Sequence, residues 1–406
     1  MNSITLDEAL KRVGQPDRKA MELAKKRWDS VAKPLGSLGA LEDAIIRIAG
    51  ILKNPRVQLN KKAIVICCGD NGIVEEGVTQ TGQEVTGIVT ENFTRGDSCV
   101  CLMAEQAGAR IVPIDLGVAA DLAGTVKEFP DLRKNFSVNL HAPGSGCTAA
   151  HESLAGAWGI PECMPPNRRR TSTVKNPIWD RKICRGTQNF LKGPAMTRAQ
   201  AIKAVETGIE AAGHLKEQGY SLIGVGEMGI GNTTTSSAVV SVLLGLAPEA
   251  VTGRGAGLTD AGLAKKIRVI QEGIRKNNPN PLDGIDVLSK VGGFDLAGIA
   301  GVIIGGAVYG IPVVLDGFIT GAAALAAAVI CPEVKKFMIA SHVSAEPAGA
   351  MVLEKLGLKP IIYGGMCLGE GTGAAAFFAL LSMAQAVYEN MSSFQEIHIE
   401  EYKHLS

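Results

Sequence analysis

The chain has 406 residues, which is enough for one large domain or for two to three ordinary ones. Its formal net charge of +1 argues against the strongly basic surface of a nucleic-acid-binding protein, and it offers no acidic field for a basic partner. Hydrophobic residues make up 46% of the chain and aromatic residues only 4%, and there are 49 glycines. This mixture favours an α/β enzyme with many tight turns between strands and helices.

Other features predict the environment of the chain. The polar first residues, 1–8, do not resemble a signal peptide. The longest apolar run, 297–315, is rich in glycine and indicates a helix, a turn and a strand, not a membrane span. Nine cysteines without regular spacing favour reduced thiols and a cytoplasmic location. We interpret 138–181 as an inserted, partly irregular segment, and its His and Cys residues match no standard zinc spacing, so we expect no metal.

Apolar runs separated by helical patterns predict a parallel sheet. Residues 3–53 have helical patterns, interrupted by a connector at 33–39. Beyond them, the continuous apolar run 63–67 is typical of a strand that is buried on both faces. The six predicted strands are 63–67, 110–114, 220–224, 312–315, 337–340 and 360–363. The helical patterns between them predict right-handed βαβ connections.

Each predicted strand runs into a loop that combines glycine with polar side chains. In open parallel sheets, ligands bind beyond the carboxyl ends of the strands. Because these loops would gather at one edge of the sheet, together they predict a binding site there. No His-Glu-x-x-His or Gly-x-Ser-x-Gly motif occurs, which argues against a metalloprotease or an α/β-hydrolase. A binding or transfer enzyme for a phosphorylated small molecule remains.

Glu370 lies between glycines at the turn from the last predicted strand into a helix of about 374–388. Flanking glycines allow unusual backbone angles and the close approach of a ligand. A carboxylate at this turn can accept a proton from a ligand if its surroundings raise its pKa. The alternative is an acid that only stabilises the N-terminus of the helix.

A second glycine-rich turn, 226–237, follows the predicted strand 220–224. Its glycines, asparagine and hydroxyl groups at a helix N-terminus would suit a phosphate group. It is not a Walker A loop, because no Gly-Lys-Ser/Thr follows. The alternative is a set of Thr and Ser caps on a core helix.

Several motifs of these loops occur together in a fixed order and spacing. They are Lys33–Gly39, Gly69–Gly72, Gly82–Thr86, Gly193–Thr197, Gly226–Thr234, Val291–Phe294, Asp316–Phe318, Ser341–His342 and Leu368–Ala374. With them, the chain resembles the nicotinate-nucleotide–dimethylbenzimidazole phosphoribosyltransferase family of the cobalamin nucleotide-loop pathway. The resemblance extends from Lys33 to about Tyr388.

The resemblance implies a fold and an assembly. The fold would be a Rossmann-like parallel sheet of six strands flanked by helices, plus a small helical domain built from both termini. The large domain would span 55–365, including the inserted segment 138–181, and the small domain would combine 1–54 with 366–406. The resemblance also implies a homodimer whose partner loops help to complete each site, and it implies no metal or cofactor.

The resemblance also implies a reaction, in which nicotinate mononucleotide gives its 5-phosphoribosyl group to a lower-ligand base. The products are the α-ribotide of that base and nicotinate. Glu370, in Leu-Gly-Glu-Gly, would be the general base, and Glu227 would lie close to the ribose or the base. Gln83, with Glu75 and Glu76 nearby, would face the base. The remaining implied substrate-binding residues are Gly229, Gly231, Asn232, Thr233, Lys266, Gly317 and Ser344 at the phosphate, and Asp316.

Two positions depart from the family pattern, since Cys367 and Val343 stand where members commonly carry basic residues. A changed pocket could favour phenol or p-cresol as the base, with Glu370 taking the O–H proton. Another alternative is a catalytically silent paralogue that binds a nucleotide and supports a partner subunit in a heterodimer. A nicotinamide-cofactor oxidoreductase is a third, against which the poor dinucleotide fingerprint argues.

Overall fold

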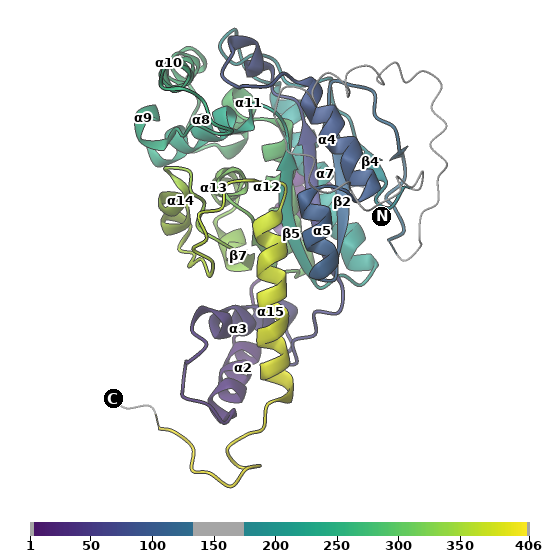
Figure 1. Ribbon diagram of the computed structural model, residues 1–406, viewed down its shortest axis with the longest axis vertical. Coiled ribbons are helices and arrows are strands. Elements are labelled where there is room, and N and C mark those ends of the chain that lie inside the picture. Colours follow the sequence, from purple (N-terminus) through teal and green to yellow (C-terminus); the bar gives the residue numbers. More distant parts are fainter. Residues whose placement is uncertain (1–3, 133–173, 404–406) are drawn as a thin grey trace, which may run out of the picture.

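The centre of the molecule is a parallel β-sheet (Figure 1). The computed structural model describes residues 4–132 and 174–403. Within these ranges the sheet has seven strands: β1 Lys62–Gly69, β2 Ala109–Gly117, β3 Thr125–Val126, β4 Ile178–Asp180, β5 Leu222–Met228, β6 Val313–Leu315 and β7 Met338–Ala340. Their order is β3-β4-β2-β1-β5-β6-β7, and all neighbours are parallel. The predicted α/β class with a Rossmann-like parallel sheet is confirmed.

The predicted set of six strands is wrong at two places. Residues 360–363 form no strand, because Ile362 makes only an isolated bridge to His342 and Tyr363 is 76% exposed. Pro360 lacks an N–H group for a sheet ladder, and two glycines follow the segment at once. Conversely, the sheet contains two strands, β3 and β4, that were not predicted. They have two and three residues at the edge of the sheet, too few to give an apolar run.

Helices cover both faces of the sheet (Figure 1). They are α1 Leu6–Lys11, α2 Arg18–Ser30, α3 Ala40–Leu52, α4 Glu84–Arg95, α5 Cys99–Gln106, α7 Arg198–Glu217, α8 Asn232–Leu244, α9 Pro248–Val251, α10 Asp260–Asn277, α11 Gly284–Val291, α12 Phe294–Tyr309, α13 Phe318–Ile330, α14 Gly349–Leu356 and α15 Thr372–Asn390, with 3-10 turns η1 Gly72–Glu76 and η2 Pro332–Phe337. The apolar run 297–315 forms most of α12, a turn and β6, as predicted. Across 4–132 and 174–403, no helix combines the length and apolarity that a membrane crossing requires.

Strand β1 is buried on both faces, which explains its uninterrupted apolar sequence. Val65 belongs to the core that the sheet forms with α7 and α12, whereas Ile64 belongs to the core with α3, α5 and α15. Glycine lets α7 and α12 pack closely, since a Cβ on Gly208 would overlap the carbonyl oxygen of Gly298. Small residues in these helices therefore serve close helix packing.

The strand order places a topological switch point between β1 and β5. Strand β1 pairs with β2 on one side and with β5 on the other. The chain therefore builds one half of the sheet outward from β1 and the other half outward from β5. Open α/β sheets bind their ligands at such a point. The sequence prediction of a site at the carboxyl edge points to the same place.

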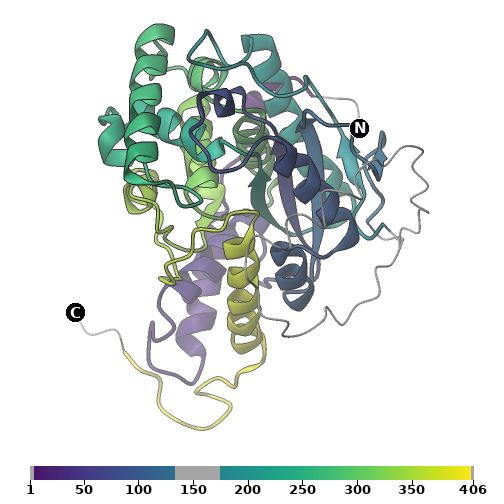
Figure 2. The same cartoon turned by 45° about the horizontal axis from the view of Figure 1, so that its top comes forward.

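Three helices extend away from the sheet. Helices α2 and α3 pack against each other and against the distal part of α15, below the sheet in Figure 1, and Figure 2 shows the same arrangement from a second direction. The rings of Trp28 and Tyr388 lie 5.0 Å apart, and Arg27 donates to the Tyr388 carbonyl oxygen at 3.0 Å. Helix α1 packs instead against α7 and α12. The division into domains 55–365 and 1–54 plus 366–406 stays a prediction.

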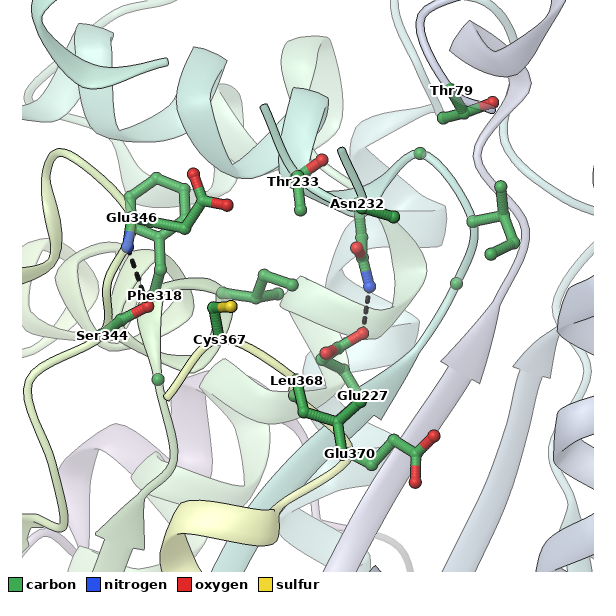
Figure 3. A pocket seen from close by; sticks show the side chains of 18 of the residues that line it. Thr79, Glu227, Asn232, Thr233, Phe318, Ser344, Glu346, Cys367, Leu368 and Glu370 are labelled. Carbon is green, nitrogen blue, oxygen red and sulfur yellow. Dashed lines mark hydrogen bonds between the residues drawn. The ribbon is translucent and has the colours of Figure 1, made fainter. Parts of the chain in front are cut away.

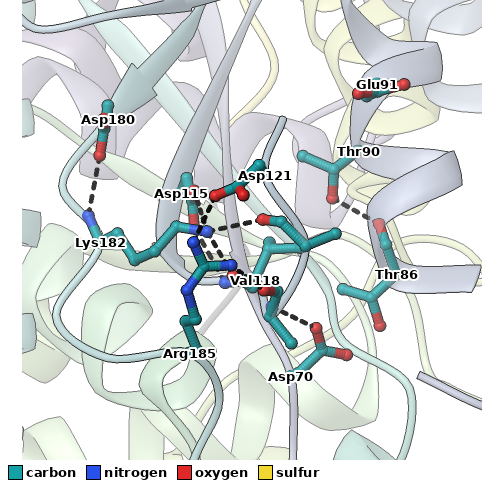
Figure 4. A network of polar contacts seen from close by, with 12 residues as sticks. Asp70, Thr86, Thr90, Glu91, Asp115, Val118, Asp121, Asp180, Lys182 and Arg185 are labelled. Carbon is teal, nitrogen blue, oxygen red and sulfur yellow. Dashed lines mark hydrogen bonds and ion pairs between the residues drawn. The ribbon is translucent and has the colours of Figure 1, made fainter. Parts of the chain in front are cut away.

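On the β2 side, the carboxyl edge of the sheet is closed by paired polar groups (Figure 4). The ammonium group of Lys182 lies 3.2 Å from the buried carboxylate of Asp115 and donates to the carbonyl oxygen of Ala120 at 2.7 Å. The Asp70 carboxylate accepts the N–H of Ala119 at 2.7 Å. These contacts tie the loops after β1, β2 and β4 to one another.

The predicted inserted segment is described only at its end. Residues 138–173, with the histidines and cysteines considered for zinc, lie outside the described residues. Residues 174–181 include β4, which pairs with β2 at Ile114 and Asp115. This end of the segment is therefore part of the sheet.

Candidate active site

A cavity of about 670 Å³ opens at the carboxyl ends of β5 and β6 (Figure 3). Its wall comes from the loops after β5, β6 and β7, from residues 78–81 and 254–258, and from the turn before α15. Nine of the residues predicted for the site line it: Glu227, Gly229, Gly231, Asn232, Thr233, Asp316, Gly317, Ser344 and Glu370. Segments far apart in the sequence thus meet at the edge where the strand loops predict a site.

Glu370 occupies a turn that only glycine neighbours permit. Its φ is +61°, and the φ angles of Gly369 and Gly371 are +90° and +95°. The turn lies directly on β5, because a Cβ on Gly226 would overlap the Glu370 carbonyl oxygen. A Cβ on Gly369 would likewise overlap the Glu227 carboxylate. A non-glycine residue with positive φ is strained unless its surroundings hold it, and such strain is concentrated at functional sites.

The side chain of Glu370 is suited to accept a proton. Its Oε2 atom is buried without a hydrogen-bond partner. Burial raises the pKa of Glu370, against a smaller lowering by the Val100 N–H at the start of α5. A carboxylate with a raised pKa is a better base near neutral pH than an exposed one.

Asp316 holds the turn that carries Glu370. Its Oδ1 atom accepts the N–H groups of Gly373 at 2.6 Å and Ala374 at 3.3 Å, and its Oδ2 atom accepts that of Gly371 at 3.1 Å. These are N–H groups at the start of α15, which a helix cannot satisfy by itself. Burial raises the pKa of Asp316 to about 7, although the three N–H groups oppose this. Backbone N–H groups thus engage both of its oxygens.

Glu227 and Asp295 form a buried acidic pair bridged by Asn232. The Asn232 amide donates to a carboxylate oxygen of Glu227, and its side chain also interacts with Asp295. Burial, together with the negative charges of Asp295, Asp316 and Glu370, raises the pKa of Glu227 well above its ordinary value. Burial raises the pKa of Asp295 to about 7. Crowded carboxyl groups of this kind favour positive charge nearby.

Two helix N-termini form the opposite end of the cavity, and a buried lysine lies behind one of them. Helix α8 begins at Asn232 after Gly231, whose φ is +92°, and α13 begins after Gly317. The Lys266 ammonium donates to the Thr233 hydroxyl at 2.8 Å and to a carbonyl oxygen at 3.2 Å. Free N–H groups at helix starts, with a cation beside them, suit a phosphate group.

Three residues predicted for the site do not line this cavity. Lys266 lies behind Thr233 and reaches the wall only through its hydroxyl. Gln83 donates to the Asn71 carbonyl oxygen at 3.2 Å. Glu75 forms a surface ion pair of 2.6 Å with Lys192, which lowers the pKa of Glu75. Their assignment to the substrate stays a prediction.

Other lining residues were not assigned to the site from the sequence. His342 packs against the start of α15, 3.0 Å from the Ser341 hydroxyl, and burial lowers its pKa. Glu346 projects from the loop after β7 (Figure 3). The Ser341–Pro347 loop contained a signal for both, a His and an acid just after an apolar run, but nothing showed that they face the cavity. Asp295, which does not line the cavity but interacts with Asn232, was not assigned either, although the start of an apolar helix is an unusual place for an acid.

The two departures from the family pattern lie in different surroundings. Cys367 lines the cavity and is exposed, so a neutral thiol stands at the wall. Val343 packs against the main hydrophobic core and does not line the cavity. Only the first of these positions can therefore contact a ligand in this chain directly.

Comparisons with known proteins agree with the fold and the cavity. A family model described as phosphoribosyltransferase matches residues 13–399. The nicotinate-nucleotide–dimethylbenzimidazole phosphoribosyltransferases of Ruminiclostridium cellulolyticum and Clostridium acetobutylicum are each 42% identical over 402 residues, covering 99% of this chain and 100% of each relative. The solved structure of the Thermus thermophilus enzyme of that name is 31% identical with a TM-score of 0.77, covering 95% of this chain and 99% of that one. The resemblance seen in the sequence is confirmed, and this chain belongs to the phosphoribosyltransferase family that these relatives represent.

Proposed function

We propose that this chain transfers the 5-phosphoribosyl group of nicotinate mononucleotide to a lower-ligand base such as 5,6-dimethylbenzimidazole, in cobalamin nucleotide-loop synthesis. The observation that carries the proposal is Glu370, a half-buried carboxylate with one buried, unpartnered oxygen and a raised pKa, at the wall of a cavity with a phosphate-binding end. The names of the relatives support the same substrates.

In the proposed reaction, Glu370 removes the N–H proton of the base. The base nitrogen attacks C1′ of the ribose while the bond from C1′ to the nicotinate nitrogen breaks. The bonding electrons return to the pyridinium ring, so nicotinate leaves without needing an acid. Attack from the face opposite the leaving group converts the β-nucleotide into an α-ribotide. General-base catalysis of this kind contributes roughly 10²- to 10⁴-fold to the rate.

The acidic groups around Glu370 suit the transition state. Bond breaking at C1′ places positive charge on the ribose, as in other glycosyl transfers. Glu227 and Asp316 line the cavity near Glu370. Negative charge that is already positioned beside C1′ stabilises such a cation more than it stabilises the neutral ribose. Gly229, Gly231, Asn232, Thr233, Gly317 and Ser344, with Lys266 behind them, would hold the phosphate.

The identity of the base stays open in one respect. Cys367 gives the cavity wall a neutral side chain where family members commonly carry arginine, which favours testing phenol and p-cresol beside 5,6-dimethylbenzimidazole and adenine. A phenol would need the same base, because its O–H proton must be removed before oxygen can attack.

The experiment incubates the purified chain with nicotinate mononucleotide and a mixture of these four bases, and identifies the products by mass. An α-ribotide with free nicotinate is the expected result, and the base it contains defines the acceptor. A folded chain that binds the mononucleotide but forms no product would favour a silent paralogue that supports a partner subunit.

The same proposal includes a homodimer in the cytoplasm. Exposed apolar side chains flank the turn of Glu370 and continue on α15, with Tyr363 76%, Leu368 57% and Met383 65% exposed. A second copy of the chain could cover them, and a heterodimer with a paralogue would do the same. Light scattering of the purified chain distinguishes a dimer from a monomer. The described cysteines, all free thiols, support a reducing compartment.

A further inference from the structure

Glu346 lines the cavity but has no part in the proposed proton transfer. It lies in the loop between β7 and α14, where its own N–H is 3.3 Å from the Ser344 hydroxyl, which accepts it. Its side chain extends toward Thr233, on the other side of the cavity from Glu227 and Glu370 (Figure 3). Its Oε2 atom is buried and has no hydrogen-bond partner.

Lys266 is an unusual neighbour for this carboxylate. The side chain is 1% exposed, and its two hydrogen-bond acceptors, the Thr233 hydroxyl and the Gly253 carbonyl, are both neutral. Burial lowers the pKa of Lys266 to about 8, and the negative charge of Glu346 opposes this lowering. A lysine with such a pKa loses its charge within the range where enzymes work.

The backbone segment 253–255 contacts both side chains. A Cβ on Gly253 would overlap the Glu346 carboxylate, whereas the Gly253 carbonyl accepts from Lys266. The N–H of Gly255 donates to Glu346, and a Cβ at Gly255 would lie 3.6 Å from the Lys266 ammonium. Glycines here let the carboxylate and the ammonium approach from the two sides of one backbone segment.

Other charged groups around α10 point elsewhere. Arg254 is paired with Asp260, and Glu249 accepts from Gln271. Lys265, next to Lys266, lies beside Gly77 instead. Among the residues that the structure describes, Glu346 is thus the acid whose charge acts on Lys266.

We infer that Glu346 is a positioning residue that holds the ammonium charge of Lys266, and thereby keeps the phosphate end of the site able to bind nicotinate mononucleotide at mildly alkaline pH. The inference rests on the proposed role of Lys266 at the phosphate. Glu346 also repels a phosphate, so its removal has two opposite effects. At acid pH, Lys266 is protonated even without the charge of Glu346, so removal of this acid leaves mononucleotide binding unchanged or tighter. At alkaline pH, Lys266 needs that charge to stay protonated, so removal of Glu346 weakens binding.

The test measures kcat/KM for nicotinate mononucleotide, and its Kd by calorimetry, from about pH 6 to about pH 9.5, since kcat/KM reports ionisations of the free enzyme. For Glu346→Gln we expect the alkaline limb of both profiles to move to lower pH by about one unit, the scale of a nearby opposite charge. The mononucleotide should bind more weakly than to the wild type at alkaline pH, but equally or more tightly at acid pH. Glu354→Gln, an exposed acid on α14, is the control for loss of one negative charge.

Two further variants separate the inference from the proposed function. Lys266→Ala should weaken mononucleotide binding at every pH, and if it does not, the proposed phosphate site is wrong. If Lys266→Ala weakens binding while the profile of Glu346→Gln matches that of the wild type, the inference about Glu346 is overturned and the site stands. In the double variant Lys266→Arg with Glu346→Gln, the alkaline limb should disappear, because a guanidinium group keeps its proton. A limb that persists there would contradict the inference.

Discussion

The two halves of the carboxyl edge of the sheet use the same residue types in different ways. On the β2 side, the buried Asp115 faces the ammonium group of Lys182, and Asp70 accepts a backbone N–H. On the β5 side, Glu227, Asp316 and Glu370 line a cavity, and none of the three has an ion-pair partner among the described residues, because Arg254, which lines the same cavity, is paired with Asp260. The first half is a closed structural joint, and the second half is an open site whose charge is unbalanced.

This difference explains how one sheet edge separates stability from function. Removal of one partner from a buried ion pair destabilises the fold, because the remaining charge is left uncompensated, and burial raises the pKa of Asp115 even with Lys182 present. Buried acids without a cation repel one another, which the folded protein must tolerate, and their raised pKa values and negative field become available to a substrate. The contrast between the two halves leads to the following predictions, which run from the largest expected effect to the smallest.

Glu370→Gln removes the proposed base from the open half. We expect turnover to fall by roughly a hundredfold or more, the scale of general-base loss, with mononucleotide binding retained. Steady-state kinetics and calorimetry measure the two quantities. Glu389→Gln, which changes an exposed acid on α15, should leave both unchanged. Equal turnover of Glu370→Gln and wild type would remove Glu370 from its role.

Lys182→Met removes the cation from the closed half. Asp115 would remain buried without its partner, so the free energy of unfolding should fall by about 2 kcal/mol, less than for a fully buried pair because Lys182 is partly exposed. Denaturant titration measures the fall. At denaturant concentrations well below the unfolding midpoint, where the variant is folded, its kcat should stay close to the wild-type value. A large loss of kcat in a fully folded variant would show that the two halves are not separate.

Asp295→Asn should change how stability depends on pH. The pKa of Asp295 is about 7 in the folded chain, above its ordinary value of about 3.8. Because the folded chain holds the Asp295 proton more tightly than the unfolded chain, this group contributes to the free energy of unfolding. The contribution is fully present below about pH 4 and is lost as the pH rises to 7. Replacing the acid should reduce this loss by about 1 to 2 kcal/mol, less than the ~4 kcal/mol of an isolated group because neighbouring acids share their protons. Urea titrations at the two pH values compare the variants. A decline as steep as that of the wild type would contradict the raised pKa of Asp295.

Asp316→Asn keeps one oxygen acceptor at the start of α15 but places an amide against another N–H. We expect a loosened Glu370 turn, which lowers kcat by about tenfold with little change in KM for the mononucleotide, because the phosphate contacts are untouched. The pH dependence of kcat should also shift, which a purely structural defect would not produce. An increase in KM alone would instead assign Asp316 to substrate binding.

The sequence predicted the parts of this contrast that depend on local patterns. The strand at Ala63–Cys67 was found because a parallel strand buried on both faces is apolar throughout. Glu370 was selected as a candidate because it lies between glycines, after an apolar run and before a helix, and the resemblance implied its role as the base. The segment 360–363 is also an apolar run, but it is bounded by Pro360 and by two glycines and is too short to form a strand of the sheet.

The remaining parts depend on contacts between distant segments. Nothing near Asp295 or Glu346 in the sequence indicates that one lies behind Asn232 and the other across the cavity. Asp115 and Asp316 both follow an apolar run, and only the fold shows that one meets Lys182 and the other the start of α15. Edge strands of two or three residues likewise form because β2 is already in place.

The most direct test of the account is a crystal structure of the chain with nicotinate mononucleotide bound. The account predicts the phosphate at the starts of α8 and α13, with Lys266 behind it, and C1′ of the ribose in the half that contains Glu227 and Glu370. A mononucleotide bound at the β2 half, or with its ribose turned away from Glu370, would contradict the central claim that the unbalanced half of the sheet edge is the active site.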